Sequence, residues 1–278
     1  MALGLKYKNQ EHIFEEKTVD GVPYLAYPLL EKTGAVRHGF STRLGGVSTG
    51  HCATMNISTT RGDDPAAVEE NRRRIAKAIG VRAEDMTYTN QTHTTNVAVV
   101  EAKDRGKRFM ETDGMVTNVP EICLVTFYAD CVPLFFVDPV HRAIGLSHSG
   151  WRGTVGKMGK VTIERMREEY GTDPTQVVAA VGPSICQDCY EVSVDVIEKF
   201  RENFDKDLWP ELFYEKADGK YQLNLWRANQ AVLTEAGVQG ENIAVTNLCT
   251  HCNPDILFSH RSTGTARGNL SAFLALIP

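Results

Sequence analysis

The sequence predicts an α+β fold, in which mixed β-sheets form the core of a single domain and helices flank them. The 278 residues are 42% hydrophobic and 23% charged, so the chain can bury a large core without disulfide bonds. Short apolar runs typical of buried strands are interleaved with longer amphipathic segments. Because strands and helices alternate irregularly, the pattern favours an α+β fold over a doubly wound one.

The clearest helix is predicted over residues 63–80. Asp64 is a suitable N-cap, Pro65 fits the first turn, and Gly80 provides a stop. Further helices are predicted over residues 157–169, 192–201 and 225–236, the last capped by Asn224 and ended by Gly237.

Six apolar runs are predicted as buried strands of one mixed sheet system. They lie at residues 97–100, 122–127, 132–137, 143–146, 177–181 and 243–245. No internal repeat, low-complexity tract or proline-rich linker divides the sequence, so residues 1–278 are predicted to form one domain.

Charge and cysteine content limit the function classes. A net charge of −5 and a pI near 5.9 disfavour a nucleic-acid-binding face. Residues 1–30 do not have the pattern expected of a signal peptide, and no run reaches the ~18 to 20 apolar residues of a membrane span. Seven cysteines, an odd number, are more typical here of metal ligands, nucleophiles or buried residues than of disulfides. We expect a cytoplasmic monomer without nucleic-acid or membrane partners.

Three histidine and cysteine positions stand where predicted strands end. His93 precedes one strand, Cys131 lies between two, and His148 follows another. Because the ends of neighbouring strands converge, we expect the three side chains to meet. Two imidazoles and one thiolate suit Zn²⁺ and leave its fourth position open, as catalytic zinc requires. Ordinary polar histidines and a buried cysteine are the alternative, because the spacings match no compact motif.

Two Cys-x-x-Cys pairs compete for a metal, Cys186 with Cys189 and Cys249 with Cys252. About 60 positions separate the pairs, whereas ribbon-like zinc sites hold them ~15 to 20 apart. The spacing therefore disfavours a shared four-cysteine site and favours separate buried or loop cysteines. Neither pair opens a helix after a strand, which disfavours a thioredoxin-like redox role.

Two glycine-rich loops each carry an arginine, Arg43 within residues 42–48 and Arg152 within residues 149–154. Backbone N–H groups and a guanidinium can bind phosphate or carboxylate, and exposed turns are the alternative. Neither loop is a P-loop or a Rossmann fingerprint. The His-x-His pairs of multicopper oxidases and the zinc deaminase signature are both missing.

Five sequence blocks occur in one order: NQTH (90–93), YADCVPL (128–134), HSGWRG (148–153), VGPSI with CYEV (181–192) and NLCT (247–250). Together they resemble the laccase-domain (YfiH-like) family, labelled polyphenol oxidases and later purine nucleoside phosphorylases. The resemblance starts at about Arg37, which leaves residues 1–36 as a family-variable part. It implies a sandwich-like core and a catalytic zinc, with copper as the alternative metal, held by His93, Cys131 and His148.

Family members cleave adenosine, inosine and methylthioadenosine with phosphate and deaminate adenosine, so the resemblance implies a purine nucleoside and phosphate as partners. The metal would act as a Lewis acid while Asp130 or Asp113 transfers a proton. Asp130 is alternatively a carboxylate that orients a metal ligand. Candidates for substrate binding are Arg43, Gln91, Asp113 and Arg152, with Trp151 or Tyr128 as stacking or core aromatics.

Two other function classes stay open. A cysteine hydrolase would use Cys131 as nucleophile and His148 as base on an amide or peptide bond, for example in editing cell-wall precursors. A non-catalytic module would bind purines without turnover. Near the C-terminus the family stretch Arg-Arg-Asp-Gly is interrupted, which leaves Arg261 and Arg267 without an assigned role.

Overall fold

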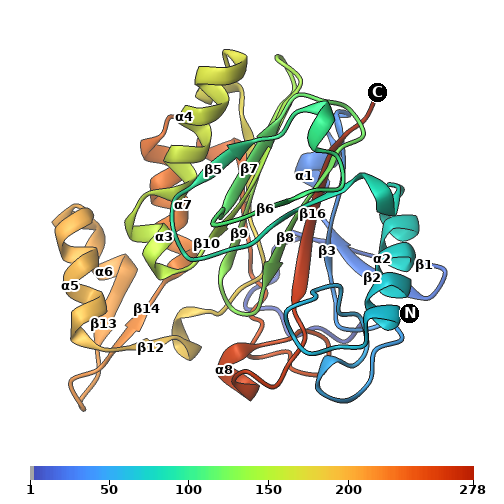
Figure 1. Cartoon of the computed structure of the whole chain (residues 1–278). Coiled ribbons are helices and arrows are strands. Elements are labelled where there is room, and N and C mark those ends of the chain that lie inside the picture. Colours follow the sequence, from blue (N-terminus) through green and yellow to red (C-terminus); the bar gives the residue numbers. More distant parts are fainter. Residues whose placement is uncertain (1–2) are drawn as a thin grey trace.

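A computed structural model describes residues 3–278, whose main feature is two β-sheets packed face to face (Figure 1). In spatial order the larger sheet consists of β1 (Glu15–Val19), β2 (Val22–Ala26), β3 (Val36–Ser41), β16 (Leu270–Leu276), β8 (Cys123–Tyr128), β4 (Met86–Thr89) and β6 (Arg108–Phe109). The second consists of β15 (Ile243–Val245), β11 (Val178–Val181), β9 (Val132–Asp138), β10 (Ala143–Ser149), β7 (Gly114–Thr117) and β5 (Val97–Val99). A small third sheet contains β12 (Glu191–Val192), β14 (Tyr221–Leu223) and β13 (Phe213–Glu215).

These sheets confirm the predicted single-domain α+β class with mixed strands. In the larger sheet β8 pairs antiparallel with β16 and parallel with β4, and in the second sheet β11 pairs antiparallel with β9 and parallel with β15. The six predicted strands are present, but the idea of one sheet system was wrong. Residues 122–127 belong to β8 of the larger sheet, whereas the other five runs lie in the second sheet.

Helices cover the outer face of each main sheet (Figure 1). On the larger sheet lies α2 (Pro65–Ile79), where the Asp64 side chain accepts a hydrogen bond from Ala66 N and Gly80 ends the helix at φ 78°, as predicted. On the second sheet lie α4 (Met158–Tyr170) and α7 (Leu225–Glu235), the latter capped by Asn224. The other helices are α1 (Pro28–Glu31), α3 (Trp151–Val155), α5 (Val194–Asn203), α6 (Trp209–Leu212) and α8 (His260–Thr263).

The apolar core forms three layers that hold these elements together. The central layer lies between the sheets, where Phe40 and Leu124 of the larger sheet pack with Phe135 and Leu146 of the second. The outer layers lie under α2 on one side and under α4, α5 and α7 on the other. Within residues 3–278 no helix is both long and apolar enough to cross a membrane.

The chain crosses from one main sheet to the other at several points, and two of these connections contain residues of the predicted site. The segment from β4 to β5 contains His93, and the turn from β8 to β9 contains Cys131. His148 lies near the end of β10, in the strand beside β9. The candidate site therefore lies at the seam between the sheets.

Candidate functional site

His93, Cys131 and His148 meet at this seam. One potential ligand atom of each lies within 4.8 Å of those of the other two. Cys131 Sγ is 4.0 Å from His93 Nε2, and the two imidazole rings stand nearly perpendicular with centroids 4.9 Å apart. The three side chains come together as predicted. Cys131 directly precedes β9 and His148 lies near the end of the adjacent β10, while His93 comes from the segment between β4 and β5. Their role as metal ligands stays a prediction.

The surroundings leave room for a metal ion. Gly150 lies beside the three side chains, and a Cβ at this position would be 3.1 Å from both Cys131 Sγ and His93 Cδ2. His148 is buried, Cys131 is half-buried and His93 is exposed. The donor set is thus open on the His93 side, and two imidazoles with one thiolate fit Zn²⁺ with a free coordination position.

One buried carboxylate, Asp113, orients both histidines. Its Oδ1 accepts hydrogen bonds from His148 Nδ1 at 2.8 Å and from the His93 backbone N–H at 3.0 Å. Its Oδ2 accepts from the backbone N–H groups of Thr92 and Thr94 and from the Thr94 hydroxyl, each at 3.0 Å. Because a carboxylate only accepts, His148 keeps a proton on Nδ1, which leaves Nε2 as the nitrogen that can bind a metal once it loses its own proton.

These contacts disfavour the predicted substrate-binding role of Asp113. The side chain is fully buried and does not line either of the cavities described below. Its contacts instead hold the backbone of His93 in the left-handed region at φ 63°, which histidine adopts more readily than most residues. Asp113 is therefore a positioning residue.

The charges within the site shift the pKa values of Cys131, His148 and Asp113. Burial by itself would raise the pKa of the Cys131 thiol, but His148 and His93 outweigh it and lower the pKa to about 6. Burial opposes the charged form of His148, yet Cys131 and Asp113 raise its pKa to about 9. For Asp113 burial is offset by the hydrogen bond from His148, and its pKa falls to about 2. A thiolate is thus favoured before any metal binds.

In metal-free protein we expect the alkylation rate of Cys131 to rise with pH and to reach half its maximum near pH 6. The thiolate is the reactive form, and a thiol whose pKa falls from 9.0 to about 6 is mostly ionised above that pH. Timed reaction with iodoacetamide and peptide mass spectrometry measure this rate. Cys52, whose pKa burial raises to about 11, is the internal control. A midpoint near pH 9 for Cys131 would contradict the described electrostatics.

Replacing Asp113 with Asn should weaken metal binding roughly 10- to 100-fold, the usual effect of losing a carboxylate that orients a ligating histidine. The amide keeps the size of the side chain but offers one acceptor instead of two. Competition with a chromogenic chelator measures the change. Asp138→Asn is a matched control. Asp138 is also a buried carboxylate that accepts a hydrogen bond from a histidine, His141 Nδ1 at 2.9 Å, but it lines neither cavity. Equal losses in both variants would count against a specific role for Asp113.

Two cavities meet at His93 and Cys131. The first measures about 290 Å³, and its wall includes all three candidate ligands together with Arg61, Arg108 and Arg267. The second measures about 160 Å³ and is more apolar, with a wall that includes Ile185, Tyr190, Leu225, Trp151, Arg152 and Arg261. A cationic space and an aromatic space therefore adjoin the same donor set.

Among the described residues, no acidic side chain forms a salt bridge with the arginines of the first cavity, Arg61, Arg108 and Arg267. Within residues 3–278 the Nε atoms of Arg61 and Arg267 are buried and make no hydrogen bond. Burial, together with the nearby charge of Arg61, lowers the pKa of Arg267 to about 10. Arg108 lies over the rings of Tyr88 and Phe127 at 5.4 and 5.7 Å. An anion in this cavity would relieve the repulsion between the guanidinium groups.

Sequence reasoning missed Arg61 and Arg108 and gave Arg267 no role. Arg61 stands in a polar loop, and Arg108 begins a two-residue strand, so no motif marks either of them. They meet Arg267 only because β6 and the loops at residues 58–61 and 260–269 border the same cavity.

Arg43 and Gln91 are occupied by main-chain contacts. Arg43 lines neither cavity, because its Nε and Nη1 donate to the carbonyls of Ala53 and Pro254 at 3.0 and 2.8 Å. These contacts disfavour the phosphate-binding role of Arg43, which stays a prediction. Gln91 does line the first cavity, but its amide pairs with Phe127, donating to O at 2.7 Å and accepting from N at 2.8 Å.

Asp130 and Arg152 border the second cavity. The Asp130 carboxylate accepts from the Thr250 hydroxyl at 2.6 Å, the Ser259 hydroxyl at 3.1 Å and the Arg261 backbone N–H at 2.6 Å. These three contacts favour a bracing role for Asp130 in the turn before Cys131 over proton transfer. Arg152 stacks on the Trp151 ring at 4.3 Å. Tyr128 is a core aromatic, with its hydroxyl donating to Ser147 O at 3.0 Å.

Comparisons with known proteins extend over nearly the whole chain. The family model described as "Multi-copper polyphenol oxidoreductase laccase" matches residues 37–277. A Deinococcus radiodurans protein named purine nucleoside phosphorylase is 40% identical over 259 residues, covering 93% of this chain and 95% of that protein. A protein named adenosine deaminase RL5, from an unknown prokaryotic organism, is 36% identical over 239 residues, covering 82% and 90% respectively. The crystal structure of YlmD from Geobacillus stearothermophilus is similar at a TM-score of 0.89 and 30% identity, covering 96% and 99%.

Proposed function

The chain belongs to the laccase-domain family, and we propose that it is a zinc-dependent purine nucleoside phosphorylase that also deaminates adenosine. Its proposed substrates are adenosine, inosine and methylthioadenosine, each with phosphate. The observation that carries the proposal is the position of the His93, Cys131 and His148 donor set, where an arginine-lined cavity meets an aromatic one. The family description names copper and laccase chemistry, but the sequence contains no His-x-His pair to hold a copper cluster.

The first cavity suits phosphate. Phosphorolysis breaks the bond between the sugar and the purine nitrogen and joins the sugar to a phosphate oxygen. Arg61, Arg108 and Arg267 would bind the phosphate oxygens, because guanidinium groups offer paired donors and full positive charge. Their shortage of acidic partners within the described residues supports this assignment.

The second cavity suits the purine. Trp151 and Tyr190 line it as aromatic surfaces, and Ile185 and Leu225 add apolar contact. Arg152 and Arg261 supply donors for the polar edge of a base. A divalent metal at the donor set would polarise an oxygen bound to it and lower the pKa of a bound water. The sugar would then lie between the cavities, close to His93 and Cys131.

Product analysis tests the proposal directly. Purified protein of known metal content is incubated with adenosine, with and without phosphate, and the bases and nucleosides are separated by chromatography. We expect adenine only when phosphate is present, inosine in both cases, and neither product after the metal has been removed with a chelator. If no purine product formed with zinc-loaded protein and phosphate, the proposal would fail.

A cysteine hydrolase is the second candidate, because Asp113, His148 and Cys131 follow one another as orienting carboxylate, base and thiol. This alternative requires no metal. It predicts full activity on an amide or peptide bond in the presence of chelator and complete inactivation by alkylation of Cys131. The phosphorylase proposal predicts loss of activity in chelator and its recovery when zinc is added back.

A further inference from the structure

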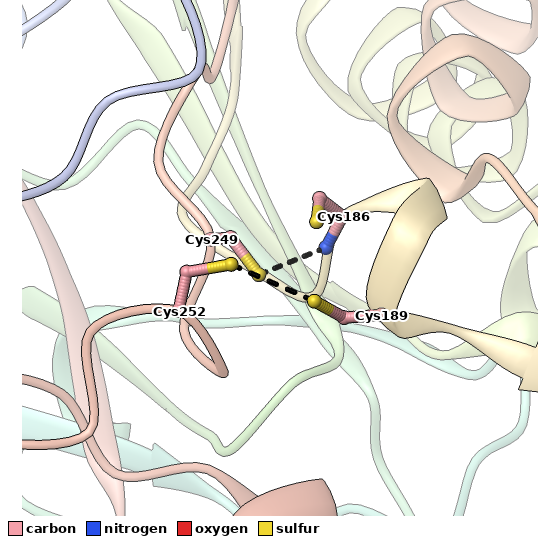
Figure 2. Close-up of side chains that lie close together, drawn as sticks. All are labelled: Cys186, Cys189, Cys249 and Cys252. Carbon is pink, nitrogen blue, oxygen red and sulfur yellow. Dashed lines mark hydrogen bonds between the residues drawn. The ribbon is translucent and has the colours of Figure 1, made fainter.

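A second group of metal-binding side chains lies outside the candidate active site. Cys186, Cys189, Cys249 and Cys252 approach from two loops, and Figure 2 shows the four side chains together. Their sulfur atoms all lie within 4.8 Å of one another, and those of Cys189 and Cys252 are 3.5 Å apart. A zinc ion with Zn–S bonds of about 2.3 Å places the sulfurs of a tetrahedral site roughly 3.8 Å apart. The separation in sequence had suggested that the two pairs would not meet.

The backbone brings the two loops together independently of the sulfurs. Ser184 and Cys249 form a parallel β-bridge, and Thr250 N donates to Ser184 O at 3.1 Å. A hydrogen bond closes the turn at each cysteine pair. Cys189 N donates to Cys186 O at 3.1 Å, and Asn253 Nδ2 donates to Cys249 O at 2.8 Å. The loops are side by side because β11 and β15, which precede them, are paired strands.

Donors and a positive charge face the sulfurs. The backbone N–H of Cys186 donates to Cys249 Sγ at 3.2 Å. The Lys8 ammonium group hydrogen-bonds to Asp188 at 3.0 Å and lies near Cys186 and Cys252. A tetrathiolate centre carries a net charge of −2 with a divalent ion, so a cation and an N–H donor stabilise it.

From this arrangement we propose that Cys186, Cys189, Cys249 and Cys252 bind one Zn²⁺ ion as a closed, structural tetrathiolate site. Four thiolates fill the tetrahedron and leave no position for substrate, in contrast to the three donors at the seam. Each thiol releases its proton to solvent as the metal binds. The proposal does not depend on the nucleoside chemistry proposed above.

The position of this cluster indicates what the metal does. Next to Cys186, Ile185 N donates to the Asp130 carbonyl at 3.1 Å, and between Cys249 and Cys252 the Thr250 hydroxyl donates to the Asp130 carboxylate at 2.6 Å. Both cysteine loops are therefore hydrogen-bonded to Asp130, in the turn that contains Cys131. The metal ties the loops together and so holds this turn and the wall of the second cavity in place.

The decisive experiment removes the first metal site and asks what stays bound. In His93→Ala/Cys131→Ala, we expect one zinc per chain by elemental analysis, compared with two in the unaltered protein. X-ray absorption at the zinc edge should show four sulfur ligands at about 2.3 Å and no nitrogen. A variant that retains no zinc, or whose zinc has nitrogen or oxygen ligands, would overturn the proposal.

A reciprocal variant tests the structural role. In Cys189→Ser/Cys252→Ser, which alters the two half-buried members, we expect loss of one zinc per chain and a fall in Tm of roughly 5 to 10 °C. Cys52→Ala is the control, since Cys52 is buried outside the cluster, and it should keep both zinc ions. If the double variant does not fold, the absorption experiment still decides. A Cys189–Cys252 disulfide in the freshly purified, reductant-free protein, with only one zinc bound, would also refute the proposal.

Discussion

Replacing Cys131 with alanine should abolish phosphorolysis and deamination of adenosine together, each by roughly 10³-fold or more. Residues that act as one unit give such large losses, and the thiolate is the only anionic donor of the set. Both activities should fall in parallel, because both depend on the same donor set. Steady-state assays of adenine and inosine formation, with metal content measured on the same sample, test this result.

The control for this variant is Cys123→Ala, which removes a buried cysteine of the layer under α2 that lines neither cavity and should keep both activities. Thermal unfolding of the two variants shows whether loss of activity reflects loss of the fold. Adenosine turnover that persisted in Cys131→Ala would refute the proposed function. If one activity survived while the other was lost, the shared donor set would be wrong.

Replacing Arg267 with methionine should lower kcat/KM for phosphate by roughly 10- to 100-fold. A hydrogen bond to a charged group contributes about 1.5–3 kcal/mol, and methionine keeps much of the apolar stem. Deamination uses water in place of phosphate, so the rate of inosine formation should change only a few-fold. Phosphorolysis measured over a range of phosphate concentrations, beside deamination without phosphate, separates the two effects.

Arg43→Met is the matched control, because the Arg43 guanidinium is bound to the carbonyls of Ala53 and Pro254 and lines neither cavity. This variant should have a lower Tm and an unchanged KM for phosphate. If Arg43→Met raised that KM as much as Arg267→Met, the assignment of the first cavity to phosphate would be wrong.

Local signals in the sequence predicted the long helices and the main buried strands well. The Asp64 cap and the Gly80 stop of α2 depend on neighbours within a turn, so they can be read from residue order. Strand β16 was missed although it lies between β3 and β8 and is buried along its length. Its run of small and apolar residues follows Gly268 and Asn269, which mark a turn, so a local signal was present, but the partners β3 and β8 are far away in sequence.

Residue chemistry and the order of five sequence blocks were enough to select His93, Cys131 and His148 and to indicate the family. The tertiary structure decided how these side chains are held and what surrounds them. Asp113 contacts His148 from 35 positions away, and the two cysteine pairs meet across 63. Periodicity and capping act over a few residues, whereas such contacts depend on which strands lie side by side. For that reason the orienting role of Asp113, the arginine-lined cavity and the four-cysteine cluster could be recognised only in the folded chain.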